Sequence, residues 1–429
     1  MYYTFPNFTG MSKLSTLAET LIGSEIVRLG NEINDRIRQG EKIYNYTIGD
    51  FDPAIFPIPK ELEQLIIESY QQGYTNYPPG DGLGELRSAV ADFIKDWEGI
   101  EYTPNEVLIA AGGRPLIYTI FKTIVDAGDK VIYAVPSWNN NHYTHLTNAV
   151  HCVIEATPEN NFMPLASDIA PHIKGAALIC LCTPQNPTGT TLPEAELKKI
   201  CELVLEENAR RGTDEKKLYV MYDQMYWTLT YVNTQHANPI SVNPAMKPYT
   251  IFVDGMSKAF AATGVRVGWA LGPTHVIGKM KALLSHLGAW SPMAEQKAAA
   301  SYLKQREAIE KYLAHYKKEL EERLNTIYNG FIQLKEKGYA VDAIVPQAAI
   351  YLTIKLDLAG KKTAGNQLIA DQSAVTSYIL DKAKLAVVPF YAFGADKQSP
   401  WYRLSVGTCK KEEITAMLAG LEAALATLQ

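Results

Sequence analysis

The sequence predicts an α/β fold, with a mainly parallel sheet covered by helices on both faces and a smaller α+β domain after it. Between about residues 83 and 270, short apolar runs alternate with helical segments, which is typical of a parallel sheet and its connecting helices. After a long helical stretch at about 293–328, the pattern changes to a mixed α+β segment. The length of 429 residues also favours more than one domain, because a single core rarely exceeds about 250–300 residues.

Three segments are predicted along the chain. Residues 1–45 form an N-terminal segment packed on the small domain, residues 46–310 the large domain, and residues 311–429 the small C-terminal domain. Apolar spacing predicts a helix at about 12–39, Pro59 and Gly73 mark the start and end of another, and a third is expected from Pro115. Strands are expected at 44–48, 106–111, 130–135, 149–155, 176–182, 218–222, 251–254, 267–271, 349–354 and 401–406.

Composition excludes several classes of function. With 47% hydrophobic and 20% charged residues the chain is ordinary for a globular protein, and a net charge of −5 provides no basic surface for nucleic acid or an anionic membrane. The cysteines are odd in number, and Cys180 and Cys182 lie in an apolar run typical of a buried strand, so neither a disulfide framework nor a metal site is expected. The sequence shows no signal peptide and no apolar run long enough to span a bilayer, so the cytoplasm is the expected compartment.

A lysine follows a predicted buried strand in the run Asp254-Gly255-Met256-Ser257-Lys258. Such a turn of small residues is a poor place for a solvated side chain, whereas a neutral amine there can condense with an aldehyde. Ser257 adds a hydroxyl, and Arg266 adds a charge suited to a phosphate. Taken alone, the Ser-Lys pair favours an ordinary structural turn.

Two other strand ends carry groups suited to the same kind of ligand. The run Ala111-Gly112-Gly113-Arg114-Pro115 joins a strand to a helix, and its free N–H groups can hold an anion, although a plain tight turn also fits. Asp223 ends an apolar strand, and a buried carboxylate needs a partner such as a protonated pyridine nitrogen. Tyr226 could reach the same ring. A helix N-cap is the alternative role for Asp223.

Three further residues are placed to complete one site. The loop Thr183-Pro184-Gln185-Asn186-Pro187-Thr188-Gly189 is rigid and fixes the amide of Asn186. Trp138 follows a strand and offers a flat face to an aromatic ring. Arg403 lies within a strand, where its fork suits a carboxylate. Because parallel strands bind ligands at their carboxyl ends, we expect these groups to converge.

In their order along the chain, these residues resemble the class I/II aminotransferases of the pyridoxal-phosphate-dependent fold-type I superfamily, and the chain is similar to aspartate aminotransferases. The resemblance runs from about Ile48 to Gly407. It implies a three-layer fold-type I architecture whose large domain binds pyridoxal 5′-phosphate. The residues that carry it are Gly49, Tyr77, Gly113, Arg114, Trp138, Asn186-Pro187-Thr188-Gly189, Asp223, Tyr226, Ser257, Lys258, Arg266 and Arg403.

The resemblance implies cofactor roles for these positions. Lys258 would form the Schiff base and then carry a proton to and from the substrate Cα, while Asp223 would pair with the ring N–H. Asn186 and Tyr226 would bond the phenolic oxygen of the ring, and Trp138 would stack on the ring. The phosphate would be held by groups at the glycine turn and around the lysine, namely Gly113, Arg114, Ser257 and Arg266.

The resemblance also implies how substrates and partners bind. Arg403, with the Gly49 backbone and the Asn186 side chain, would bind the substrate α-carboxylate, and Trp138 would border the substrate. The small-molecule partners would be an amino acid and a 2-oxo acid. Tyr77 would reach the phosphate of the neighbouring subunit, so a homodimer with shared active sites is implied.

The choice of substrate rests on fewer residues. Some aspartate aminotransferases bind the distal carboxylate with an arginine from the partner subunit. We expect the corresponding loop at 285–291, which has no arginine here. Arg114 could bind that carboxylate directly or through water, with Ser24 assisting, so we expect aspartate or glutamate as donor and 2-oxoglutarate as acceptor. Trp290 and nearby tyrosines would instead suit an aromatic or other neutral amino acid. A carbon–sulfur β-lyase shares this fold, whereas a DNA-binding regulator would need a further domain and a basic patch.

Overall fold

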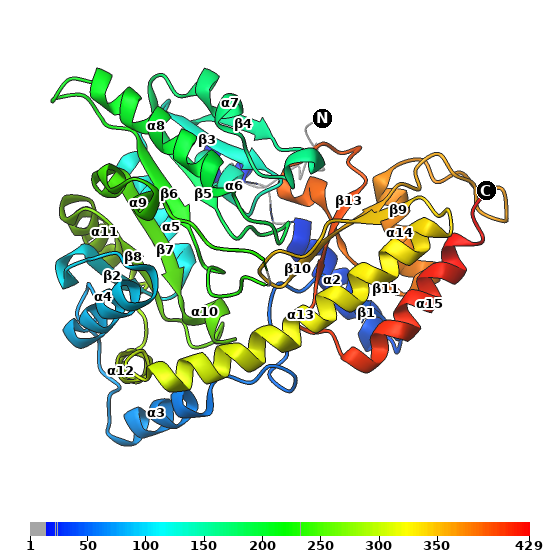
Figure 1. Cartoon of the computed structure of the whole chain (residues 1–429), viewed down its shortest axis with the longest axis horizontal. Helices are drawn as coiled ribbons and strands as arrows, with labels where there is room; N and C mark the ends of the chain where they lie inside the picture. The colour runs from blue at the N-terminus through cyan, green and yellow to red at the C-terminus, as the bar shows by residue number, and fades with distance from the viewer. Residues whose placement is uncertain (1–13, 22, 24, 232) are drawn as a thin grey trace.

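The computed structural model describes residues 14–21, 23, 25–231 and 233–429. Its largest sheet has seven strands in the order β2-β8-β7-β6-β5-β3-β4 (Figure 1). Within this sheet β8 runs opposite to the other strands, so it pairs antiparallel with β2 and β7, and the remaining pairs are parallel. The predicted mainly parallel sheet is confirmed. The strands are β2 (Val107–Ala110), β3 (Lys130–Val135), β4 (Val150–Glu155), β5 (Ala176–Cys182), β6 (Tyr219–Asp223), β7 (Thr250–Gly255) and β8 (Gly268–Leu271).

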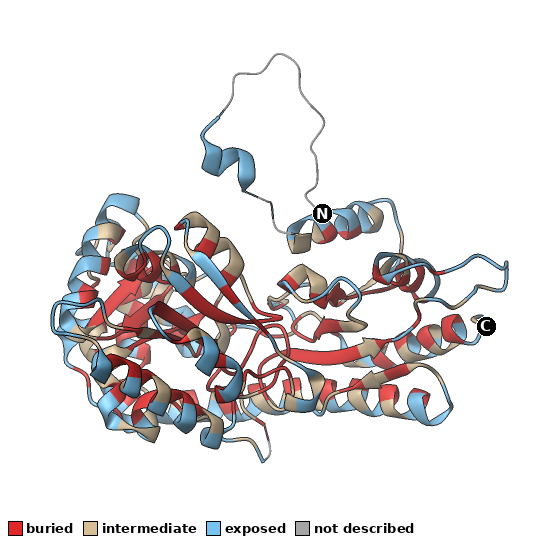
Figure 2. Ribbon diagram, turned by 90° about the horizontal axis from the view of Figure 1, so that it is seen from above, coloured by how far each residue is buried: buried red, intermediate tan, exposed pale blue. Residues whose placement is uncertain are grey.

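Helices cover both faces of this sheet, because successive apolar residues of each strand point to opposite sides. On β7, Ile251 and Val253 lie in one core and Phe252 in the other. The strands are buried between helices whose outer faces are exposed (Figure 2). The first core is covered by α5 (Gly113–Ile124) and α11 (Thr274–Leu287), and the second by α4 (Gly84–Glu98), α8 (Glu194–Arg210) and α12 (Met293–Tyr302).

A second sheet is antiparallel, in the order β12-β13-β10-β9. Its strands are β9 (Val341–Ala343), β10 (Tyr351–Leu356), β12 (Val388–Pro389) and β13 (Trp401–Ser405). The N-terminal segment joins this part of the chain, because β1 (Tyr44–Asn45) pairs in parallel with β11 (Leu385–Ala386). The long helix α13 (Arg306–Glu336) packs on β9 and on α15 (Ile414–Leu425), and α14 (Gln372–Ala383) also packs on α15 (Figure 1).

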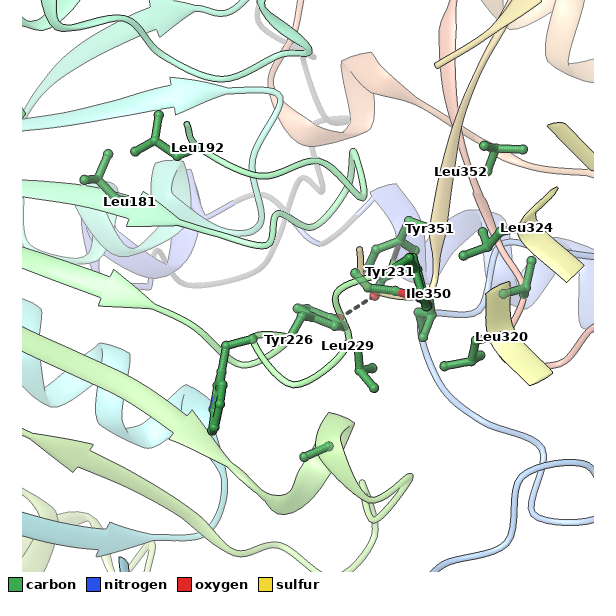
Figure 3. Close-up of a cluster of buried hydrophobic side chains, with 14 of the residues drawn as sticks. Leu181, Leu192, Tyr226, Leu229, Tyr231, Leu320, Leu324, Ile350, Tyr351 and Leu352 are labelled. Atoms are coloured by element: carbon green, nitrogen blue, oxygen red, sulfur yellow. Dashed lines mark hydrogen bonds between the residues drawn. The ribbon is translucent and has the colours of Figure 1, made fainter. Parts of the chain in front are cut away.

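One buried cluster connects the two sheets. It includes Tyr226 and Leu229 from the loop after β6, Ile350 beside β10 and Leu324 from α13 (Figure 3). The domain boundaries at residues 45 and 310 stay predictions. Helix α13 spans the boundary at residue 310 without interruption. The remaining helices are α1 (Thr16–Thr20), α2 (Glu25–Arg38), α3 (Lys60–Gln71), α6 (Asn140–Leu146), α7 (Ala166–Ile169), α9 (Pro239–Val242) and α10 (Met256–Ala259). None of the helices in the described part of the chain combines the length and apolar character needed to cross a bilayer.

Most predicted strands are confirmed, and the helices need correction. β3 and β5 coincide with their predicted spans, and the other strands of the large sheet agree within one residue. The single helix at 293–328 is wrong: the chain breaks at 303–305, because α12 packs on α3 and α4 whereas α13 packs on the second sheet. The predicted helix at 12–39 is likewise interrupted after Thr20. The strand at 44–48 is shorter than predicted because its partner β11 has two residues, and the helix expected from Pro115 begins at Gly113.

Candidate active site

A cavity of about 560 Å³ lies at the carboxyl ends of β5, β6 and β7, where parallel sheets bind ligands. Residues from α2, α5 and α10 and from β10 and β13 complete its walls. The structure therefore brings together residues that are far apart in the sequence. All predicted site residues except Tyr77 line the cavity: Gly49, Gly113, Arg114, Trp138, Asn186, Asp223, Tyr226, Ser257, Lys258, Arg266 and Arg403.

The Lys258 side chain enters the cavity from α10, directly after β7. Its Nζ donates to the Gly49 carbonyl at 2.6 Å and lies 5.3 Å from the centre of the Phe51 ring. Burial lowers the pKa of the Lys258 amine to about 8, an effect that nearby Asp50 opposes. An amine with a lowered pKa has a larger neutral fraction, and the neutral form is the one that condenses with an aldehyde.

Asp223 ends β6 and lies between Cys182 of β5 and Val253 of β7 in the sheet register. The Met225 N–H donates to its Oδ1 at 3.1 Å, and no residue that the structure describes forms an ion pair with it. Burial raises the pKa of the Asp223 carboxyl to about 6. A half-buried carboxyl that lines a cavity and has no ion-pair partner among the described residues fits a ligand that brings its own protonated nitrogen.

The start of α5 and the Arg266 guanidinium lie against each other at the cavity. Arg266 donates from Nη1 to the Thr263 carbonyl at 2.8 Å and from Nη2 to the Ala111 carbonyl at 2.6 Å. Gly112 precedes α5 with φ +85°, and a Cβ there would clash with this guanidinium, so the close approach requires glycine. The free N–H groups of α5, the Arg266 charge and the nearby Ser257 together suit a phosphate.

Arg403 is a buried cation on β13, only 1% exposed. Its Nη1 donates to Asn186 Oδ1 at 2.9 Å, and its Nη2 donates to the Thr47 carbonyl at 2.6 Å. These neutral acceptors fix the guanidinium without cancelling its charge, and its Nε has no hydrogen-bond partner among the described residues. At Gly49 a Cβ would lie 2.8 Å from the Tyr351 hydroxyl, so glycine leaves room beside Arg403. The guanidinium is thus prepared for a carboxylate.

Aromatic side chains form the rest of the wall. The Tyr226 hydroxyl lies 2.7 Å from the Tyr351 hydroxyl, and the Tyr351 ring lies 4.7 Å from Arg403 Cζ. Trp138 borders the cavity, and the exposed Arg114 guanidinium lies 5.2 Å from the centre of its ring. A flat ligand ring could stack on Trp138 while Tyr226 donates to an oxygen on its edge.

Sequence reasoning missed several residues of the cavity wall. Tyr351 hydrogen bonds to Tyr226, and Asp50 accepts from Thr263 Oγ1 at 2.6 Å. Ile26 and Val27 of α2 also line the cavity. Asp50 directly follows Gly49 at a predicted strand end, which is a usable signal, whereas nothing local marks Tyr351 or α2 as part of the site.

Two predicted positions lie elsewhere. Tyr77 is 83% exposed outside the cavity of its own chain, and its ring makes an edge-on contact with Trp290 at 5.5 Å. Trp290 is likewise not among the residues that line the cavity of its own chain, and its effect on substrate choice stays a prediction. Ser24 lies outside the described residues.

Known proteins share this sequence and fold. Residues 42–421 match the family model "Aminotransferase class I and II". An aspartate aminotransferase of Bacillus sp. (strain YM-2) is 31% identical over 386 residues, which cover 89% of this chain and 92% of that protein. A Petunia hybrida enzyme named bifunctional aspartate aminotransferase and glutamate/aspartate-prephenate aminotransferase is 28% identical, covering 96% of this chain and 81% of its own length.

Solved structures agree with the fold. The aspartate aminotransferase of Rhizobium meliloti superimposes with a TM-score of 0.88 at 25% identity, covering 98% of this chain and 100% of that one. The Thermus thermophilus aspartate aminotransferase with maleate gives a TM-score of 0.85 at 26% identity, covering 97% and 100%. With a family match that spans most of its length, this chain belongs to aminotransferase class I and II and is a fold-type I transaminase.

Proposed function

We propose that this enzyme uses pyridoxal 5′-phosphate to move the amino group of an acidic amino acid, aspartate or glutamate, to a 2-oxo acid such as 2-oxoglutarate. The observation that carries the proposal is the single cavity that Lys258 and Asp223 both line, with Arg403 and the start of α5 in its walls. Among the described residues, Asp223 forms no ion pair and Arg403 Nε has no hydrogen-bond partner.

The residues present fit the cofactor. Asp223 would hold the proton on the ring nitrogen, because a carboxyl whose pKa is raised by desolvation gains from a cationic neighbour. Trp138 would support the ring, and Asn186 and Tyr226 would donate to its phenolic oxygen. The phosphate would lie among the groups described at the start of α5: Gly113, Arg114, Ser257 and Arg266. When bound, pyridoxal phosphate supplies an aldehyde that takes up the amino group and a ring that withdraws electrons from Cα.

The chain's own residues would then orient the substrate and move one proton. Arg403 would bind the α-carboxylate through its fork, beside the Gly49 backbone, and so fix which bond of Cα faces Lys258. Lys258 is suited to accept and return that proton, because burial lowers its pKa to about 8 and leaves a neutral amine accessible. The cavity walls from α2 and β10 would limit the entry of water.

Arg114 supports an acidic substrate. It lines the cavity, is exposed, and has no ion-pair partner among the described residues, so its charge is available to a distal carboxylate. The names of the relatives point the same way. The apolar side chains of Ile26, Val27 and Ile117 in the same wall favour a second candidate, an aromatic or other neutral amino acid.

Arg114→Gln is expected to lower kcat/KM for aspartate and glutamate roughly 10- to 150-fold, because one hydrogen bond to a charged group contributes about 1.5–3 kcal/mol. The value for phenylalanine should change little, since glutamine keeps the backbone amide that the phosphate would use. Steady-state assays with all three donors measure this, and Arg114→Lys, which keeps the charge, should lose less. Equal losses for acidic and aromatic donors would reject the acidic substrate.

The proposed function is tested by incubating the holoenzyme with a panel of amino acids and 2-oxoglutarate. Transamination predicts one glutamate and one new 2-oxo acid for each donor consumed, quantified by mass spectrometry, with aspartate the best donor. Oxaloacetate as acceptor tests glutamate as donor in the same way. Release of pyruvate and a thiol from cystathionine without any acceptor, in place of that exchange, would identify a carbon–sulfur β-lyase.

We further propose a cytoplasmic homodimer with shared sites. The five cysteines are unpaired, as in proteins of a reducing compartment. Tyr77 and Trp290 form an aromatic pair outside their own cavity, which suits a contribution to the site of a second subunit. Sedimentation at assay concentrations measures the assembly state.

A further inference from the structure

A buried carboxyl lies on the face of β7 that points away from the cavity. Val253 lines the cavity, so the next residue, Asp254, points to the opposite side of the strand. Asp254 is 1% exposed, and the carboxyls of Asp223 and Glu98 are close enough to interact with it electrostatically. Burial raises the pKa of Asp254 to about 7. No ion pair with Asp254 forms among the residues that the structure describes, so its burial carries a desolvation cost that its hydrogen bonds have to offset.

The two oxygens of Asp254 join two segments that carry active-site residues. Oδ1 accepts from the Gly255 N–H at 2.7 Å, and Gly255 is the N-cap of α10, which bears Lys258. Oδ2 accepts from the indole N–H of Trp227 at 2.8 Å, and Trp227 directly follows Tyr226. A carboxyl can accept at both oxygens, whereas an asparagine amide can accept at only one. Aspartate can therefore bind the N–H groups of both Gly255 and Trp227 with separate oxygens, which asparagine, a side chain of the same size, cannot.

A second buried carboxyl holds the same loop from its other end. Gln224, the residue after Asp223, donates from its backbone N–H to the Val253 carbonyl at 3.0 Å. Its side chain donates from Nε2 to Glu98 Oε1 at 2.6 Å. The loop from Asp223 to Trp227 is thus fixed to β7 and α4 by neighbours of its cavity-facing residues.

We propose that Asp254 is a positioning residue that, through Trp227 and Gly255, fixes the Lys258 amine relative to Tyr226 and Asp223. The proposal rests on the proposed function, because it assigns these cavity residues to catalysis. Asp254 touches neither cofactor nor substrate, since its side chain lies on the far side of the sheet. Loss of the hydrogen bonds that join Trp227 and Gly255 through Asp254 should lower the rate of proton movement. It should affect substrate affinity less, because Arg403 on β13 would bind the α-carboxylate.

The test uses Asp254→Asn, Trp227→Phe and the double variant as holoenzymes, with rates expressed per cofactor-bearing site. Each single variant should lose about 10- to 100-fold in kcat, because small displacements of reacting groups have effects of this size. KM for the amino donor should change less than threefold, roughly. The double variant should be no slower than the slower single variant, because each change alone already breaks the link from Trp227 through residue 254 to Gly255. Trp97→Phe is the matched control, since Trp97 packs on Trp227 but has no hydrogen bond to Asp254.

The outcomes separate this proposal from the proposed function. Normal kcat per site in both single variants, with only a lower melting temperature, would show a purely structural role and overturn the proposal. Losses that add in the double variant would also overturn it. If Asp254→Asn does not fold, Trp227→Phe decides alone, because it breaks the same link by removing the indole N–H and keeps an aromatic ring. An inactive wild-type enzyme in this assay would reject the proposed function instead.

Discussion

Lys258→Ala is expected to abolish turnover with every amino donor and to remove the visible absorption of the lysine-linked cofactor. The substitution removes one amine that has two roles. This amine attaches the cofactor, and it is also the base that moves the Cα proton. General acid–base catalysis alone contributes about 10²–10⁴-fold, and covalent attachment adds to it. Steady-state rates and an absorption spectrum of the purified protein measure both effects.

Two control variants make this result specific. Lys258→Arg keeps the positive charge in the cavity but cannot condense with an aldehyde, so it should be as inactive as the alanine variant. Lys317→Ala removes another lysine whose pKa burial lowers, yet Lys317 lies outside the cavity, and turnover should persist. Activity of Lys258→Ala within tenfold of the wild type, roughly, would contradict the assignment of Lys258.

Arg403→Lys is expected to lower kcat/KM for all donors, acidic and aromatic alike. Lysine keeps the charge but lacks the fork, so it cannot bind a carboxylate at two points, and Asn186 and the Thr47 carbonyl lose their donors. Disrupting a buried, hydrogen-bonded charge pair costs about 2–5 kcal/mol, which corresponds to roughly 30- to 4,000-fold. Steady-state kinetics with a donor panel measure the loss.

A buried arginine outside the cavity provides the comparison. Arg323 lies on α13, is 5% exposed and donates from Nε to the Cys409 carbonyl at 2.8 Å. Arg323→Lys should therefore lower stability without a selective loss of kcat/KM. Similar kinetics for the two variants would mean that Arg403 acts only through folding and does not bind the α-carboxylate.

The large sheet and most of the site could be predicted from the sequence for one physical reason. Strands buried on both faces are continuous apolar runs, and polar residues at their carboxyl ends must converge on the same edge of the sheet. Lys258, Asp223 and the glycine turn before α5 each follow such a run, and all of them line the cavity. Arg403 could be recognised because a charged residue inside a strand needs a partner.

The parts that could not be predicted depend on contacts between distant segments. Tyr351 looks like any other residue of an apolar strand until β10 brings it to Tyr226. The apolar face of α2 was expected only to pack on the small domain, yet it also lines the cavity. The break between α12 and α13 follows from their different packing partners, since no proline or glycine marks it.

The most direct test of the cofactor assignment is to reduce the holoenzyme with borohydride, digest it and identify the modified peptide by mass spectrometry. Reduction turns the bond between the lysine and the cofactor into a stable amine, which keeps the label on its residue. The expected result is a single pyridoxyl-phosphate label on Lys258. A label on another lysine would contradict the claim that Lys258 attaches the cofactor in this cavity. An unlabelled protein that still transaminates would contradict it as well.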